Sequence, residues 1–377
     1  MKSKQVTEVK KQIEEFKDMF NDKPEQYFRD GTWFETLVKM ILTTHAKKVN
    51  AEYFKKKYVG LDNERIAYKL VDTTSNYVAI AGGLAAAAAS AAELSAVITA
   101  GATIAAFGAT LIGEISFITY KQLQMIYDIS VILDARLNKD DPEDIIMLFW
   151  FSLGVNIWED VANLALKAGP RSAEYLGRKA LRSGLRSALQ TVLTKLGGTK
   201  LAQKLTEKAL LKMIVPGLNI PIAATVNKSI TKGLGKKAIK SFKIRGACIR
   251  SIDKLKETER IYEIMSVALI YHIGIIDEAV DKTSKCIEMQ NNVAKRIALR
   301  EEEENLVEKL VELEFEEFLT IIGEIEDNRV KEYLSEIACY SSLVSKSDSD
   351  EKLDRLLAEL LVENKQLLVK RCQRRIE

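Results

Sequence analysis

The segment from Gly82 to Gly113 constrains this chain most, because nearly every residue in it is small or apolar. It reads GGLAAAAASAAELSAVITAGATIAAFGATLIG, and Glu93 is its one charged residue. The part from Leu94 to Gly113 has no charge and is as long as a helix that spans the core of a bilayer. The segment can therefore cross a membrane, lie on one, or pack inside a helical core.

The order of bulky and small residues favours close packing against another helix. Four bulky residues recur every seven positions: Val97, Ile104, Leu111 and Ile118. Gly101 and Gly108 lie on the adjoining face, and such a smooth face lets two helix backbones approach closely. We predict a close-packed helical hairpin over 82–113, held against the apolar helix around residues 149–151. Integral insertion, constitutive or triggered, is the alternative.

The whole chain predicts an all-α fold. It has only five prolines, its periodic segments follow the helical repeat, and no run shows sustained alternation of apolar and polar residues. We expect one helix over residues 5–21 and another from Asn63 to Tyr77. After Thr258 we expect three or four acidic amphipathic helices, separated near Asn291, near Asp327 and at 345–351. The predicted parts are N-terminal amphipathic helices (1–60), a helical domain with a basic middle (61–250) and an acidic helical C-terminal domain (251–377).

The net charge of +3 hides a strong asymmetry along the chain. Residues 1–166 carry 18 basic and 22 acidic side chains, whereas residues 167–256 carry 21 basic and only 3 acidic ones. Residues 257–377 carry 17 basic and 28 acidic side chains. A segment with so much positive charge repels itself, so we expect an anionic partner beside it. The candidates are a membrane surface, a nucleic acid and the acidic C-terminal third of the chain.

Basic residues in this middle segment form three rows with a spacing of four residues, which places each row along one face of a helix. The rows are Arg178, Arg182 and Arg186; Lys200, Lys204, Lys208 and Lys212; and Lys228, Lys232, Lys236 and Lys240. Leucines such as Leu181 and Leu185 lie opposite the first row, as in helices that bind the membrane interface. We predict that the rows bind an anion-rich surface.

An anionic membrane is the predicted partner, with nucleic acid as the alternative. Basic clusters are attracted to anionic lipid, whereas nucleic-acid binders usually add aromatic residues for stacking or a recognisable motif. Residues 167–256 contain only Tyr175 and Phe242 as aromatics, and no such motif. A third alternative is a pore-forming or membrane-disrupting effector whose Ala/Gly hairpin inserts on a trigger.

Three stretches carry a family resemblance: LVDTTSNYVAIAGGLAAAAA, IYDISVILDARLNKDDPEDIIMLFWFSLG and VPGLNIPIAATVNKSITKGLGKKAIKSFK. Over about residues 65–245 they resemble the EcsC family, named for a protein encoded beside a bacterial ABC transporter. The positions that match its motifs are Asp141, Pro142, Glu143 and Asp144, then Pro216, Asn227 and Gly235. The resemblance implies a mostly helical, membrane-associated accessory protein, and it brings no catalytic residues. We expect a membrane protein or an ABC transporter as its partner.

The C-terminal stretch EIACYSSLVSKSDSDEKLDRLLAEL resembles a TerB-like helical domain. The acidic Asp-Gly turn typical of that domain is replaced here by SKSDSDE, so we predict no metal site. The four cysteines, Cys248, Cys286, Cys339 and Cys372, form no C-x-x-C pair, which predicts reduced thiols in a cytosolic setting. The N-terminus lacks the apolar region of a secretion signal, so we expect a cytoplasmic, peripherally membrane-associated protein.

Motifs of known enzyme classes are absent from the sequence. The two histidines, His45 and His272, are in neither H-E-x-x-H nor E-x-x-H spacing, and G-x-S-x-G, Walker A and G-x-G-x-x-G do not occur. We therefore expect a non-enzymatic protein without a cofactor. His272 follows the apolar run IMSVALIY, which predicts a buried core histidine rather than a ligand.

Overall fold

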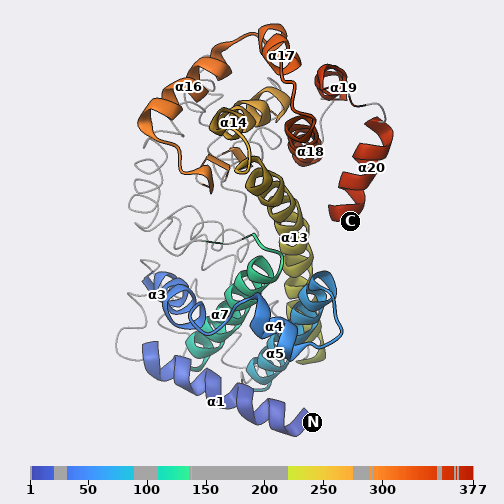
Figure 1. Cartoon of the computed structure of the whole chain (residues 1–377). Helices are drawn as coiled ribbons and strands as arrows, with labels where there is room; N and C mark the ends of the chain where they lie inside the picture. The colour runs from blue at the N-terminus through green and yellow to red at the C-terminus, as the bar shows by residue number, and fades with distance from the viewer. Residues whose placement is uncertain are drawn as a thin grey trace, which may run out of the picture. The chain divides into compact units, whose positions relative to one another are not determined.

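The structure is a computed structural model, and all the regular secondary structure that it describes is helical, which confirms the all-α prediction (Figure 1). The described residues are 2–20, 32–88, 109–135, 137, 220–274, 289–290, 293–294, 296–345, 350–360, 362 and 365–376. The chain divides into two compact units. Unit 1 takes in residues 1–155 and 189–239, and unit 2 takes in residues 156–188 and 240–377.

Unit 1 is built around α7, a helix that is buried on nearly all sides. Its described elements are α1 (Lys2–Phe20), α3 (Thr32–Met40), the π-helix η1 (Ile41–His45), α4 (Ala51–Lys57), α5 (Asn63–Ala88), α7 (Ala109–Ile132) and α13 (Ile220–Leu255) as far as Ile239. The helices α1, α3 and α5 all pack on α7. On α1, Val9, Ile13 and Phe16 are buried because their spacing places them on one face.

Two glycines allow helices of unit 1 to approach closely. A Cβ atom added at Gly113 on α7 would lie 2.7 Å from the carbonyl oxygen of Ile13 on α1. A Cβ added at Gly235 on α13 would lie 2.4 Å from Cγ2 of Val71 on α5. Both distances are too short for a side chain, so each crossing requires glycine.

Gly113 is also the last residue of the Ala/Gly segment, and it packs against α1. Residues 89–108, with Gly101 and Gly108, lie outside the described residues, as do residues 149–151. The hairpin over 82–113 therefore stays a prediction. At both ends of the segment, Gly82 and Gly113 are buried in described helices.

Unit 2 contains more helices than the three or four expected after Thr258. Its described elements are α13 from Lys240, α14 (Arg260–Gly274), α16 (Glu301–Glu312), α17 (Phe315–Gly323), α18 (Asn328–Ser345), α19 (Asp350–Glu359) and α20 (Lys365–Ile376). One additional break separates α19 from α20. Another follows α16, where the backbone nitrogen of Glu314 donates to Glu317 Oε2 at 3.0 Å in a capping box. The predicted breaks near Asp327 and at 345–351 match the gaps before α18 and α19.

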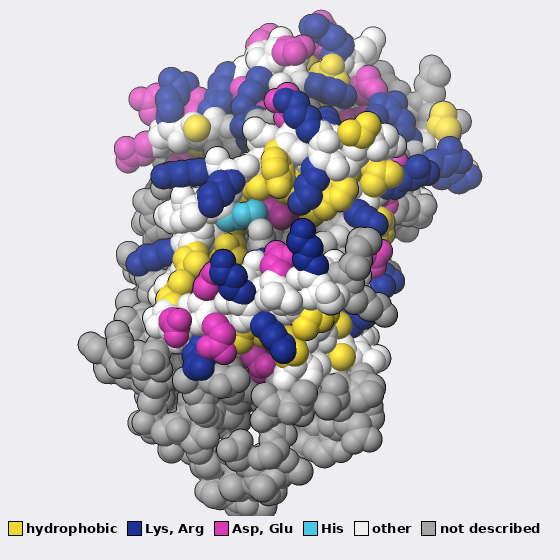
Figure 2. All heavy atoms as spheres, turned by 90° about the horizontal axis from the view of Figure 1, so that it is seen from below, with side chains coloured by type: hydrophobic (Ala, Val, Ile, Leu, Met, Phe, Trp, Pro, Cys, Tyr) yellow, Lys and Arg dark blue, Asp and Glu magenta, His cyan; other side chains and the backbone are white. Residues whose placement is uncertain are grey.

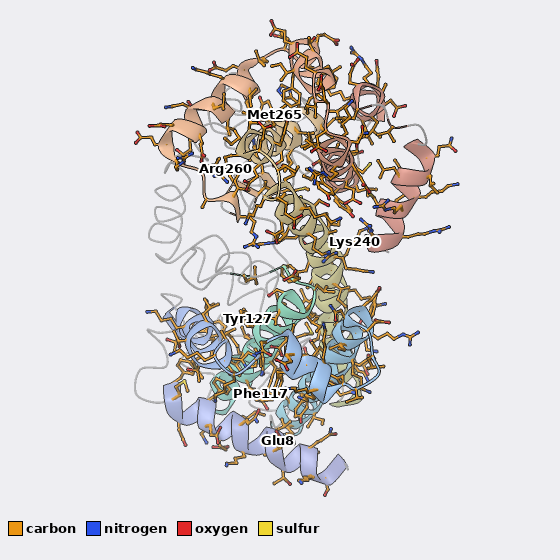
Figure 3. All side chains as sticks on the ribbon, in the orientation of Figure 1. Glu8, Phe117, Tyr127, Lys240, Arg260 and Met265 are labelled. Carbon is orange, nitrogen blue, oxygen red and sulfur yellow. The ribbon has the colours of Figure 1, made fainter. Side chains whose placement is uncertain are left out.

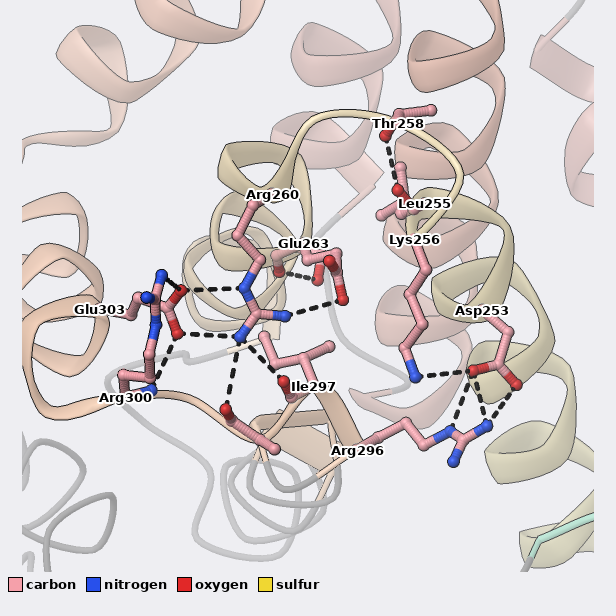
Figure 4. Close-up of polar contacts among 12 residues, drawn as sticks. Asp253, Leu255, Lys256, Thr258, Arg260, Glu263, Arg296, Ile297, Arg300 and Glu303 are labelled. Atoms are coloured by element: carbon pink, nitrogen blue, oxygen red, sulfur yellow. Dashed lines mark hydrogen bonds and ion pairs between the residues drawn. The ribbon is translucent and has the colours of Figure 1, made fainter.

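The start of α16 is fixed by a buried carboxylate, Glu303 (Figure 4). Arg260 on α14 donates to it from Nε at 3.0 Å and from Nη2 at 2.8 Å, and Arg300 donates from Nη2 at 2.7 Å. The hydrogen bonds from Arg260 and Arg300 hold the pKa of Glu303 well below its usual range. In the same region, Arg296 binds Asp253 on α13 with both arms of its guanidinium.

A second buried carboxylate, Glu336 on α18, attaches α20. Arg371 and Arg375 on α20 each donate to Glu336 Oε1 at 2.7 Å. Ser251 on α13 donates to Oε2 at 2.7 Å, and the ammonium group of Lys254 lies 4.0 Å from the same oxygen. Burial pushes the pKa of Glu336 upward, but the hydroxyl of Ser251 and the charge of Arg375 outweigh it, and the pKa is lowered.

Candidate functional site

The third predicted lysine row lies on α13, and its members differ in exposure. Lys236 and Lys240 are exposed, whereas Lys228 and Lys232 are half-buried. Lys232 makes an ion pair of 3.0 Å with Asp72 on α5, so part of its charge is already balanced within unit 1. The outward-facing end of the row is therefore Lys236 and Lys240.

The opposite side of α13 is apolar and buried. Leu234, Ala238, Ile239 and Phe242 are all at most 6% exposed. The helix is therefore amphipathic, with Lys236 and Lys240 on its exposed side, whereas Lys243 is only 7% exposed. The other two rows, 178–186 and 200–212, lie outside the described residues.

On the described part of the face in Figure 2, basic side chains are interspersed with acidic and hydrophobic ones. They do not merge into one continuous basic field there. Binding of an anionic surface by this face would therefore use local groups of basic side chains, with hydrophobic side chains beside them.

A partly buried chain of polar groups, which joins α7 to η1, was not predicted from the sequence. Lys121 Nζ donates to Gln124 Oε1 at 3.4 Å, and Gln124 Nε2 donates to His45 Nδ1 at 3.2 Å. His45 Nε2 in turn donates to Asp128 Oδ1 at 2.6 Å. Residues 121, 124 and 128 are three and four positions apart, so they share one face of α7.

The π-helix η1 brings His45 to this chain of groups. A π-helical turn holds one residue more than an α-helical turn, and such turns occur often at functional sites. The His45 side chain is 11% exposed and that of Asp128 is 9% exposed. Burial raises the pKa of Asp128, and the hydrogen bond from His45 opposes the shift. The pair therefore joins η1 to α7 at the edge of the core.

Aromatic rings surround the ammonium group of Lys121, which lies 5.5 Å from the ring centre of Phe117, 5.7 Å from Tyr77 and 5.8 Å from Tyr120. Burial lowers the pKa of Lys121, and the charges of Glu8 and Asp128 oppose the shift. Figure 3 labels Phe117 and Tyr127 on α7 and Glu8 on α1. This lysine is therefore a core cation stabilised by ring faces rather than part of a surface row.

Comparison of the chain with protein-family models, curated proteins and solved structures finds no match. The likeness to the EcsC and TerB-like families stays a prediction. Of the matching positions, 141–144 and Pro216 lie outside the described residues. Asn227 and Gly235 are buried in α13. The carbonyl of Asn227 accepts from Thr231, and Gly235 allows the contact with Val71.

His272 is a core residue, as predicted. It is 6% exposed, its Nε2 lies 2.9 Å from the carbonyl oxygen of Leu310, and its ring stacks on Phe318 with 4.2 Å between ring centres. Burial lowers its pKa. Within the described ranges, no group of three or more His, Cys, Asp or Glu side chains could hold a metal ion.

The described cysteines are buried free thiols, and two of them meet. Cys372 on α20 is hydrogen-bonded to Cys339 on α18, which lowers the pKa of Cys372. Burial raises the pKa of Cys248. No helix in the described part of the chain is both long and apolar enough to cross a membrane.

Proposed function

We propose that this protein is a non-enzymatic accessory or effector protein that binds anionic membrane at the cytoplasmic face. It would bind peripherally, through the basic faces of amphipathic helices. The observation that carries the proposal is the outward end of the lysine row on α13, where Lys236 and Lys240 project from a helix whose other face is buried.

The electrostatic repulsion within this lysine row supports the proposal. Like charges four residues apart destabilise a helix slightly, and neither lysine has an ion-pair partner among the described residues. A lysine near an anionic bilayer gains about 1 kcal/mol, which offsets such repulsion. Because Lys232 already pairs with Asp72, it should contribute less to binding than Lys236 and Lys240.

The resemblance to the EcsC family supports the same proposal. That resemblance adds a membrane protein, such as an ABC transporter, as a partner class. A protein of this kind would reach its partner by first binding the lipid surface around it.

Flotation with lipid vesicles tests the proposal. The full chain should float with vesicles of phosphatidylcholine and phosphatidylglycerol, stay behind with phosphatidylcholine alone, and be released by salt. The double variant Lys236→Gln, Lys240→Gln should bind about thirtyfold more weakly, from about 1 kcal/mol for each lysine. Lys232→Gln is the matched control from the same row, and it should change binding less.

The alternatives predict different results in the same set of assays. A nucleic-acid-binding regulatory module would shift DNA or RNA in a gel and ignore the vesicles. A pore-forming effector would release dye trapped in the anionic vesicles. If the wild-type chain does not float with anionic vesicles at low salt, the proposal is wrong.

A further inference from the structure

The connection between α4 and α5 exposes an unusual number of apolar side chains. Among the described residues only six large hydrophobic side chains are exposed, and three of them fall within residues 53–61. Tyr53 is 42% exposed, Leu61 is 36% exposed, and Val59 reaches 83%. We refer to residues 53–61 as the α4–α5 corner. Its tip, Val59, is almost entirely in contact with solvent.

The corner is held in this position by the structure on both sides. Asn50 caps α4 by accepting from the backbone nitrogen of Tyr53 at 2.7 Å, and Asp62 caps α5 by accepting from Arg65 at 2.8 Å. Gly60 takes a left-handed conformation with φ of 81°, which reverses the chain directly after Val59. Phe54 is the one buried residue of α4. The chain therefore presents Val59 outward in a defined turn.

Exposed lysines lie close to this apolar tip along the chain. Lys55, Lys56 and Lys57 end α4, and Lys47 and Lys48 precede it; all five are exposed. The ammonium group of Lys57 lies 5.6 Å from the ring centres of both Tyr53 and Tyr58. Lys56 makes an ion pair of 2.9 Å with Glu52. Residues 45–65 contain six basic and three acidic side chains, so the segment has a net positive charge.

We propose that the α4–α5 corner is the site that inserts into the membrane. Val59 would enter the interface between headgroups and acyl chains, the two tyrosines would lie at headgroup level, and the lysines would bind lipid phosphates. This inference rests on the proposed function, and it assigns the insertion to unit 1.

The chemistry of the corner favours lipid over other anionic partners. Nucleic acid offers phosphates to the lysines and bases that can stack on a tyrosine, but it offers no apolar layer for the outward Val59. An anionic bilayer supplies both a negative surface and an apolar layer beneath it. The pairing of one protruding apolar side chain with exposed lysines in the adjoining segments matches that combination.

Two variants of the full chain test the corner with the same vesicles of phosphatidylcholine and phosphatidylglycerol. Val59→Asp should weaken binding about tenfold, because it replaces the inserted side chain by a charge that lipid repels. The double variant Lys48→Gln, Lys55→Gln should weaken it about fivefold for each lysine. Met19→Asp is the matched control, because Met19 on α1 is a 48% exposed hydrophobic residue of the same unit.

Circular dichroism melting establishes that each variant is folded, and Val59→Leu should bind at least as well as the wild type. If Val59→Asp binds as the wild type does, or loses no more than Met19→Asp, the corner does not insert. If the wild type floats and only the Lys236→Gln, Lys240→Gln variant loses binding, the corner proposal is wrong and the proposed function stands. Absence of wild-type flotation overturns both.

Discussion

Glu114 should make the stability of unit 1 depend on pH in an unusual direction. The residue is 4% exposed on α7, and burial raises its pKa from 4.5 to about 8. The folded state therefore keeps its proton where the unfolded state has lost it. Because the folded pKa is raised, the stabilisation is fully present below the unfolded pKa and is lost as pH rises toward about 8.

The size of the effect follows from the two pKa values. One pKa unit corresponds to about 1.4 kcal/mol, so a carboxyl that is ionised only in the unfolded state at about pH 7 costs on the order of 3 kcal/mol. Glu114→Gln replaces the protonated acid by a neutral side chain of similar shape. We expect it to stabilise unit 1 by about that amount near pH 7 and to have little effect below about pH 4.5.

Urea unfolding across this pH range measures the difference. Trp33 is buried in unit 1 and reports its unfolding when Trp150 and Trp158 are replaced by Phe. Glu15→Gln, which removes the charge of a 60% exposed side chain on α1, is the control and should leave the pH profile unaltered. If Glu114→Gln changes stability equally at acidic and neutral pH, the carboxyl ionises in the folded protein as it does in water.

Three further predictions concern packing and buried charges. Gly235→Ala should destabilise unit 1 by about 1–3 kcal/mol through the clash with Val71, while Gly233→Ala, whose Cβ meets no atom within 4 Å, should stabilise it by about 0.5–1 kcal/mol in urea unfolding. If both substitutions changed the stability in the same direction, the close approach of α13 to Val71 would be contradicted. Glu303→Gln should lower the stability of unit 2 by about 1–3 kcal/mol at neutral pH. Because the pKa of Glu303 is lowered, urea unfolding should show a smaller loss in acid, and a constant loss would contradict the prediction. The pKa of His272 is lowered in the folded state, so as pH falls below about 6.5 the unfolded state binds a proton before the folded state does. The loss of stability caused by His272→Leu should therefore become smaller as pH falls. A loss that does not depend on pH would show that the ring protonates equally well in both states.

Periodic apolar patterns predicted much of the described fold. The helix expected over 5–21 appears as α1, and the one expected from Asn63 appears as α5, because their buried residues recur at helical spacing. The short α4 was not predicted, since AEYFKKK has a single buried residue and depends on the Asn50 cap instead of a stripe. A capping residue next to an unpatterned segment is a weak signal when read alone.

The candidate site residues were likewise predictable where the signal lies within one helix, and not where it depends on contacts between helices. The spacing of Lys236 and Lys240 predicted their common face, because the spacing is local to one helix. The ion pair of Lys232 with Asp72 depends on how α13 packs on α5, and no local pattern contains that information. The contact of His45 with Asp128 likewise joins residues 83 positions apart. The one available signal was the run of polar residues at helical spacing inside the apolar α7.

Glu336 has a consequence for how sequences related to this one can vary. One buried carboxylate accepts hydrogen bonds from Ser251 on α13 and from Arg371 and Arg375 on α20. Losing the acid alone would leave two guanidinium groups facing each other, whereas exchanging the whole set for apolar residues of similar volume can be neutral. Over evolutionary time these positions should therefore covary, with intermediates rare, and an alignment should show them inherited or replaced as a group.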